Sequence, residues 1–222
     1  MTINEIFDKG GPVVWILTGY SVLAVAIVIE RLLQFMLMPR PPRDFEAQLG
    51  RALRAGTAGQ LLAPLQGPEV VLVRTLVEAA AENVRALGRV ATRIGSQQLQ
   101  AMERGFRTLE VLGNTAPLLG LFGTITGMIK AFVVIQQAGG RVDAQALAGG
   151  IWEAMITTGV GLAVSIPILL LLHFLEGMAD RRAQAMRTYA SVALELLPHA
   201  PDEPLEEEGA AVHHRDGADH AV

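Results

Sequence analysis

Residues 153–175 read EAMITTGVGLAVSIPILLLLHFL, a glutamate followed by 22 positions without a formal charge. A helix needs about 20 apolar residues to cross the hydrocarbon core of a bilayer, so this stretch is long enough to span a membrane. A carboxylate at the edge of such a span is costly to bury, which makes Glu153 a candidate functional residue. The stretch therefore predicts an integral membrane protein whose function concerns ions.

Two further apolar segments precede this one. The first runs from Val13 to Met38 and ends at Pro39, and the second covers residues 109–136. Because lipid offers no hydrogen-bond partner to the backbone, segments of this length are expected to cross the bilayer as helices. The sequence predicts an all-α membrane protein with three transmembrane helices.

Composition narrows the possible functions. Hydrophobic residues make up 51% of the 222 positions, too many for an ordinary soluble domain. The chain has no cysteine, which excludes disulfides, thiol catalysis and Cys-ligated metal sites. It also lacks a glycine-rich phosphate loop, a Ser/His/Asp set and histidines at metal-ligand spacing. We therefore predict no enzyme, no metal site, no cofactor and no binding to nucleic acid.

Arginine and lysine are distributed unevenly outside the three spans. Residues 31–107 contain eleven arginines and residues 181–187 contain three, whereas the opposite side has only Lys9 and Arg141. Loops rich in Lys and Arg remain in the cytoplasm. The N-terminus is predicted to lie outside, and the central region and the C-terminus inside.

The central region has a helical period. Apolar residues recur at three- and four-residue steps from Val73 to Ile94. No proline follows Glu69 until Pro117, so the pattern predicts one helix from Glu69 to Gln136. Such a helix would be on the order of 100 Å long and would project from the bilayer as a stalk.

Two other helices are expected in the cytoplasmic parts. A short one covers residues 45–62, before a break at Pro64 and Gly67-Pro68. The third span is expected to continue as an amphipathic helix to Leu197, because Pro198 then stops it.

Small and polar residues form a stripe on each of the last two spans. On the second span these are Gly113, Ala116, Gly120, Gly123, Thr124 and Gly127, and on the third they are Glu153, Thr157, Gly161 and Ser165. One interpretation is close helix packing, with the threonine hydroxyls bonded to their own helix. The other is that the stripes line a polar path for an ion or contact a partner helix. Glu153 favours the second, because packing does not need a carboxylate.

Lys130 is a second charged residue at membrane depth. Lys130 and Glu153 each lie about six residues inside the outer end of their span, roughly 9 Å deep. An ion pair between them is one hypothesis. The alternative is that the long side chain of Lys130 reaches back to the interface.

Pro117 and Pro167 interrupt the backbone hydrogen bonding of the second and third spans. In lipid the carbonyls that they free need another donor. Ser165 and Thr115 are the candidate hydroxyls.

Three motifs resemble those of the MotA/TolQ/ExbB proton channel family. Residues 113–132, GNTAPLLGLFGTITGMIKAF, are similar to its second-span signature, and residues 153–167, EAMITTGVGLAVSIP, to its third. Residues 29–32, IERL, resemble the end of its first span. The motifs cover all three spans in order, whereas the resemblance weakens in residues 43–108 and is absent beyond Pro198.

The resemblance implies a subunit of an oligomeric bundle, a homo-pentamer around two copies of an ExbD/TolR-like partner. That partner has a single span, with an Asp that carries protons driven by the proton-motive force. The polar residues implied to face it are Thr124, Glu153 and Thr158, and Thr157 and Lys130 complete the predicted proton pathway. The residues assigned to helix packing are Gly113, Gly120, Gly123, Gly127, Gly161, Pro117 and Pro167. Thr158 lies roughly 140° around the helix from Glu153, so these two residues face different neighbours.

Flagellar members of the family have a fourth span and a larger cytoplasmic domain, and the absence of both here favours the ExbB/TolQ branch. The leading hypothesis is an ExbB-like subunit in the bacterial inner membrane that energises TonB-dependent outer-membrane transport together with a TonB-like protein. One alternative is a TolQ-like subunit for envelope integrity. Another is a non-conducting scaffold whose stalk recruits soluble partners.

This topology divides the chain into seven segments. They are a periplasmic segment with the first transmembrane helix (1–38), a cytoplasmic helical stalk (39–108), the second transmembrane helix (109–136), a periplasmic loop (137–146), the third transmembrane helix (147–175), a cytoplasmic helix (176–197) and an acidic tail (198–222). The tail is rich in Pro and Glu with little apolar surface, so it is predicted to be disordered.

Overall fold

The computed structural model describes residues 3–137 and 144–198, and within them the chain is all-helical. The helices are α1 (Ile3–Leu37), α2 (Phe45–Arg54), α3 (Ala58–Leu62), α4 (Pro68–Ala81), α5 (Leu87–Met102), α6 (Phe106–Gln137) and α7 (Ala144–Leu196). Three of them are long and apolar enough to cross a membrane, which confirms the predicted all-α membrane fold. The tail beyond residue 198 and residues 138–143 lie outside the described part, so the predicted disorder of the tail is not tested.

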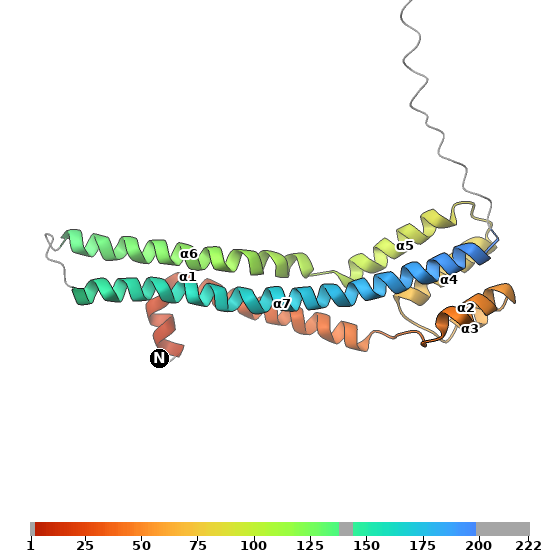
Figure 1. The fold of residues 1–222 in the computed structure, drawn as a ribbon, viewed down its shortest axis with the longest axis horizontal. Coiled ribbons are helices and arrows are strands. Elements are labelled where there is room, and N and C mark those ends of the chain that lie inside the picture. Colours follow the sequence, from red (N-terminus) through yellow and green to blue (C-terminus); the bar gives the residue numbers. More distant parts are fainter. Residues whose placement is uncertain (1–2, 138–143, 199–222) are drawn as a thin grey trace, which may run out of the picture.

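The three membrane helices α1, α6 and α7 lie side by side (Figure 1). At one end they share a core in which Val28 and Phe35 of α1 meet Leu109 of α6 and Leu172 of α7. Towards the other end Leu17 of α1 packs with Ala116 of α6. Their outward surfaces carry large exposed apolar side chains, as expected for helices that contact lipid or other spans.

The first helix bends at Gly11, whose backbone is non-helical (φ 60°, ψ −161°). A positive φ of this kind suits glycine because it has no Cβ. The following Pro12 has no backbone N–H to donate into the preceding turn. The membrane-spanning part of α1 is therefore Gly11–Leu37, and the N-terminal part turns away from the bundle (Figure 1).

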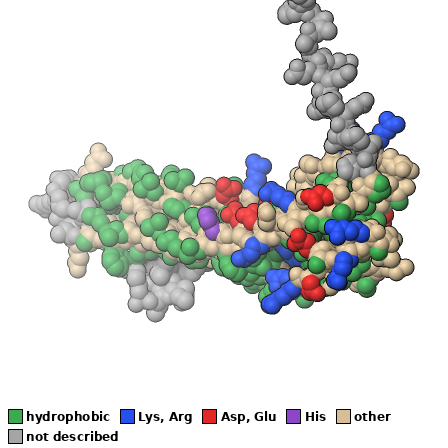
Figure 2. All heavy atoms as spheres, turned by 45° about the vertical axis from the view of Figure 1, so that its right-hand side comes forward, with side chains coloured by type: hydrophobic (Ala, Val, Ile, Leu, Met, Phe, Trp, Pro, Cys, Tyr) green, Lys and Arg blue, Asp and Glu red, His purple; other side chains and the backbone are tan. Residues whose placement is uncertain are grey.

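The helix α7 continues without a break from Ala144 to Leu196, over 53 residues. This confirms the predicted extension of the third span, and at 1.5 Å per residue the helix is about 80 Å long. The helices α2 to α5 pack around its distal half. Hydrophobic side chains dominate the half of the surface formed by the membrane helices, and charged side chains gather at the end formed by α2 to α5 (Figure 2).

The predicted single helix from Glu69 to Gln136 is wrong, because the chain forms α4, α5 and α6 there. Asn83 takes a left-handed conformation (φ 57°), and Val84 N–H donates to the Ala79 carbonyl at 3.0 Å. These features are typical of a helix C-cap, which asparagine can form in place of glycine. After it α5 packs back against α4 and α7, so the stalk is folded rather than extended (Figure 1).

A second interruption separates α5 from α6 at Gly105, which has a φ of 89°. The predicted helix over residues 45–62 is also divided, into α2 and α3, by Gly56 with a φ of 70°. In both places glycine ends a helix that the apolar period alone would continue. The predicted break before Pro68 is confirmed, because α4 begins there after Gly67.

Candidate functional site

Glycines allow the backbones of α6 and α7 to approach closely at the centre of the membrane bundle. A Cβ added at Gly120 would lie 2.8 Å from the Thr157 carbonyl oxygen. One added at Gly161 would lie 2.7 Å from the Ala116 carbonyl oxygen. Gly123 faces the side chain of Thr157, with 2.6 Å between its added Cβ and Oγ1. Distances this short leave no room for a side chain, so the contact depends on these glycines.

Further contacts set the register of the two helices. Gly127 faces Ala154, and an added Cβ would lie 3.2 Å from the Ala154 Cβ. Closer to the loop that joins the helices, a Cβ added at Gly150 would lie 2.6 Å from the Cβ of Ala131. At the other end, a Cβ added at Gly113 would lie 2.6 Å from Cδ2 of Leu169. The contact therefore extends along most of the two spans.

Three threonine hydroxyls gather around this contact. Thr124 Oγ1 of α6 lies 3.2 Å from the Gly120 carbonyl oxygen and 3.1 Å from that of Ala154. Thr158 Oγ1 of α7 lies 3.2 Å from the same Gly120 oxygen, and it hydrogen-bonds Thr124 Oγ1. Thr157 donates to the Ala154 carbonyl at 2.7 Å. The structure thus brings Thr124, Thr157 and Thr158 into one cluster that joins the two helices.

Burial separates these threonines into two kinds. Thr157 is only 3% exposed, and both of its hydroxyl contacts are to carbonyls at the helix contact. Thr124 and Thr158 are half-buried at the edge of that contact. Thr157 therefore serves the packing of the two helices, whereas the Thr124–Thr158 pair remains accessible to a third helix or to water.

Ser165 compensates for the proline in α6. Pro117 has no N–H for the carbonyl of Gly113, four residues earlier, and the buried Ser165 Oγ donates to that carbonyl at 2.7 Å. Ser165 is one of the two hydroxyls expected to partner a freed carbonyl. Thr115, the other, donates to the Val111 carbonyl of its own helix at 2.7 Å. The proline and the serine thus form one unit across the α6–α7 contact.

Lys130 and Glu153 lie at similar levels along the bundle. The contacts of Gly127 with Ala154 and of Gly150 with Ala131 place Lys130 and Glu153 within about 3 Å of each other along the helix axes. Lys130 is exposed at the surface of the single chain. The side chain of Glu153 lies outside the described part of the structure, so the predicted ion pair stays a prediction.

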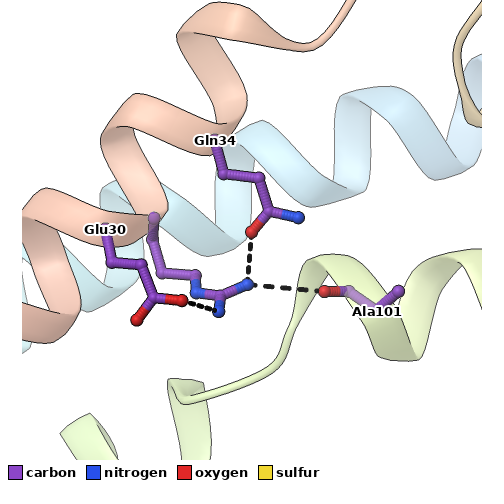
Figure 3. A network of polar contacts seen from close by, with 4 residues as sticks. Glu30, Gln34 and Ala101 are labelled. Atoms are coloured by element: carbon purple, nitrogen blue, oxygen red, sulfur yellow. Dashed lines mark hydrogen bonds and ion pairs between the residues drawn. The ribbon is translucent and has the colours of Figure 1, made fainter.

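Two buried arginines hold helices α4 and α5 against the membrane bundle. Arg31 of α1 is 6% exposed, and its guanidinium bonds Gln34, Glu30 at 2.8 Å and the Ala101 carbonyl at 3.5 Å (Figure 3). Ala101 is in the last turn of α5, where carbonyls lack a partner within the helix. Arg31 therefore connects the end of α5 to α1.

The second buried arginine is Arg182 of α7. It forms an ion pair with Glu69 of α4 at 2.7 Å, and it donates to the carbonyls of Met38 at 3.0 Å and Pro39 at 2.8 Å. The side chain of Glu69 is 1% exposed. Arg182 thereby joins α4 and the end of α1 to the long helix.

Acidic residues lie close together where the connection between α5 and α6 passes α7. Burial raises the pKa of the Glu103 carboxyl above its ordinary value, and the nearby negative charges of Asp180 and Glu176 raise it further. Glu103 lies between α5 and α6, beside a part of α7 that follows the uncharged stretch.

Comparison with known protein families assigns the chain to one of them. A model of the MotA/TolQ/ExbB proton channel family matches residues 50–188, which include α6 and most of α7. The chain belongs to this family. The predicted resemblance is confirmed, and both the second-span and the third-span motifs lie within the matched region.

Relatives within the MotA/TolQ/ExbB family are similar over most of the chain. A protein named ExbB-like 1 from Synechocystis is 33% identical over 86% of this chain and 76% of its own length. The biopolymer transport protein ExbB of Neisseria meningitidis serogroup B is 26% identical over 79% of this chain and 88% of its own. The biopolymer transport protein exbB1 of Vibrio cholerae is 28% identical over 81% and 82%.

Membership of the MotA/TolQ/ExbB family, with the three spans, makes this chain a multi-pass membrane protein and a biopolymer transport channel subunit. The family consists of channel subunits and not of enzymes.

The prediction from sequence missed the roles of Glu69 and Arg182. Glu69 was expected only as the start of a helix, and Arg182 only as one of three cytoplasmic arginines. The two residues are 113 positions apart, so no local pattern connects them. The one signal available is the position of Glu69 directly after Gly67-Pro68, which fixes it at the beginning of α4.

Proposed function

We propose that this chain is the channel subunit of a proton-driven motor of the ExbB type in the bacterial inner membrane. Five copies surround two copies of an ExbD/TolR-like partner whose single span carries an Asp. The proton-motive force moves protons through that Asp, and a TonB-like protein transmits the resulting motion to outer-membrane transport. Each proton that crosses 100 mV supplies about 2.3 kcal/mol.

The observation that carries this proposal is the half-buried Thr124–Thr158 pair. Each hydroxyl has one proton to donate and two lone pairs that can accept. The hydroxyl protons of Thr124 and Thr158 can point to the carbonyls of Ala154 and Gly120, or one can point to the other threonine. In each case the two hydroxyl oxygens keep lone pairs that are free at the edge of the helix contact. They can accept a bond from a protonated Asp or from water, and rotation of either hydroxyl supplies a donor to the ionised Asp. The pair therefore suits both protonation states of a partner carboxyl.

Glu153 and Lys130 have a different role in the proposal. They lie towards the outer ends of α7 and α6, beyond the threonine pair, at similar depth. Charges in a low-dielectric region act strongly on a titrating neighbour. In this proposal the charges of Glu153 and Lys130 set the electrostatic potential along the path that a proton takes to the partner Asp.

The experiment is proton flux in proteoliposomes that contain the chain and its co-purified partner. Thr124→Val and Thr158→Val keep the shape of the side chain and remove the hydroxyl, and we expect each to slow flux about tenfold or more. The matched control is Thr126→Val, because within the described residues Thr126 donates only to its own helix, to the Gly123 carbonyl at 3.0 Å. Full flux in the Thr124→Val/Thr158→Val double variant would refute the role of the pair.

Assembly is tested separately by intact-complex mass spectrometry. The chain is extracted gently from its native membrane, and five copies with two copies of a single-span protein are expected. A homo-oligomer without such a partner would contradict the motor and favour the scaffold.

A further inference from the structure

A basic pocket opens beside the inner end of the membrane bundle, away from the α6–α7 contact. It has a volume of about 490 Å³ and lies where the chain leaves α1, between that connection, α4 and α7. Its wall includes the arginines Arg40, Arg43, Arg181 and Arg182. The proposed proton pathway uses none of these residues.

Three of the four arginines are available to a ligand. Arg182 is 7% exposed and is already bonded to Glu69 and to two carbonyls. Arg40, Arg43 and Arg181 are exposed, and none belongs to either of the two ion pairs formed within residues 3–137 and 144–198. Glu69 is the only acidic residue among the described residues of the wall, and it is already paired with Arg182. The other three arginines of the wall therefore have no carboxylate partner within the described part of the chain.

The same pocket has an apolar side. Phe35, Phe174 and Met178 line it, and Phe174 is 55% exposed. Phe174 lies in the last turn of the uncharged stretch that ends at Leu175, so this side faces the level at which the span leaves the bilayer. Basic pockets between membrane helices on the cytoplasmic side are suited to anionic lipid head groups.

We propose that this pocket binds the head group of an anionic phospholipid. The phosphate of the head group contacts Arg40, Arg43 and Arg181, and an acyl chain lies along Phe174 and Met178. A free phosphate shares the anionic chemistry but would make no use of the apolar side. The bound lipid thus joins the α1–α2 connection to α7, next to the Arg182–Glu69 ion pair.

The experiment counts lipids bound to the full chain in its native assembly by intact-complex mass spectrometry. Dioleoylphosphatidylglycerol is titrated into detergent micelles against dioleoylphosphatidylcholine. We expect the natural chain to retain the anionic lipid preferentially. Arg40→Gln/Arg43→Gln/Arg181→Gln should weaken its binding about fivefold for each arginine neutralised. The three residues are exposed, so the variant is expected to fold.

A matched control is Arg85→Gln/Arg89→Gln/Arg93→Gln, which removes the same charge from exposed positions between α4 and α5 and on α5. We expect this variant to keep the lipid preference, and an equal loss of lipid binding in both triple variants would overturn the proposal.

A second experiment distinguishes a lipid head group from a free phosphate as the bound anion. It measures lipid binding by the Phe174→Ala variant and the competition of inorganic phosphate with the lipid. Weaker lipid binding by Phe174→Ala would support a lipid site. If inorganic phosphate displaces the lipid and Phe174→Ala has no effect on lipid binding, the pocket is an anion site and not a lipid site.

Discussion

Thr157 and Thr158 are neighbours in the sequence but have different surroundings. Consecutive residues lie 100° apart around a helix, so one is directed into the α6–α7 contact and the other to its edge. Spacing alone left both interpretations of the stripe open, packing and a polar path. The structure supports packing for Thr157, and it leaves Thr124 and Thr158 as the pair that a partner can reach.

A substitution at Gly120 can test the close approach of α6 and α7. Gly120→Ala places a Cβ 2.8 Å from the Thr157 carbonyl oxygen, so α6 and α7 must separate. We expect a loss of about 1–3 kcal/mol from overpacking, larger than the gain of up to about 1 kcal/mol in helix propensity. Thermal unfolding in detergent measures the change. Gly159→Ala is the control, because a Cβ there meets nothing within 4 Å, and it should be neutral or slightly stabilising.

Ser165 and Pro117 are expected to be energetically coupled. Ser165→Ala leaves the Gly113 carbonyl without its 2.7 Å donor and should cost about 1 kcal/mol. Pro117→Ala restores an N–H to that carbonyl, so Ser165→Ala should cost less in this background. A double-mutant cycle from thermal unfolding measures the coupling, and strictly additive effects would show that the serine does not compensate for the proline.

Among the elements, those set by hydropathy and by proline were predictable. The three spans, the start of α4 at Pro68 and the continuation of α7 to Leu196 all follow long apolar runs or clear breaks. The turns at Asn83 and Gly105 were not predicted, because the apolar period passes through them with no proline to stop it. The fold of the stalk depends on packing of α5 against α4 and α7, which is a tertiary effect.

The docking of α4 depends on a buried charge that needs its partner. Arg182→Met leaves the Glu69 carboxylate buried without a cation, and removing one member of such a pair costs about 3–5 kcal/mol. We expect a large drop in the unfolding temperature and faster proteolysis near α4. Arg182→Met/Glu69→Leu should recover much of the stability, because no charge then remains buried. Arg187→Met, at an exposed position of the same helix and outside the basic pocket, should change stability by no more than about 0.5 kcal/mol.

At the scale of the whole molecule, charge and apolar surface are segregated along one axis. The helices α2 to α5 and the distal half of α7 carry most of the charged side chains, and the membrane helices carry the apolar ones (Figure 2). The eleven arginines of residues 31–107 all lie in the last two turns of α1 or after that helix. Because such segments remain in the cytoplasm, this distribution favours a periplasmic N-terminus.

The orientation can be tested directly because the chain has no cysteine, so a single introduced cysteine is a unique label. Ser96→Cys is exposed on α5 and Gln137→Cys is exposed at the end of α6. A membrane-impermeant maleimide should label Gln137→Cys in spheroplasts and Ser96→Cys only in inside-out vesicles or after permeabilisation. The reverse pattern would place the arginine-rich end outside. In that case a proton that enters from outside would reach the threonine pair before Glu153. The proposed order, in which it meets Glu153 first, would then be wrong.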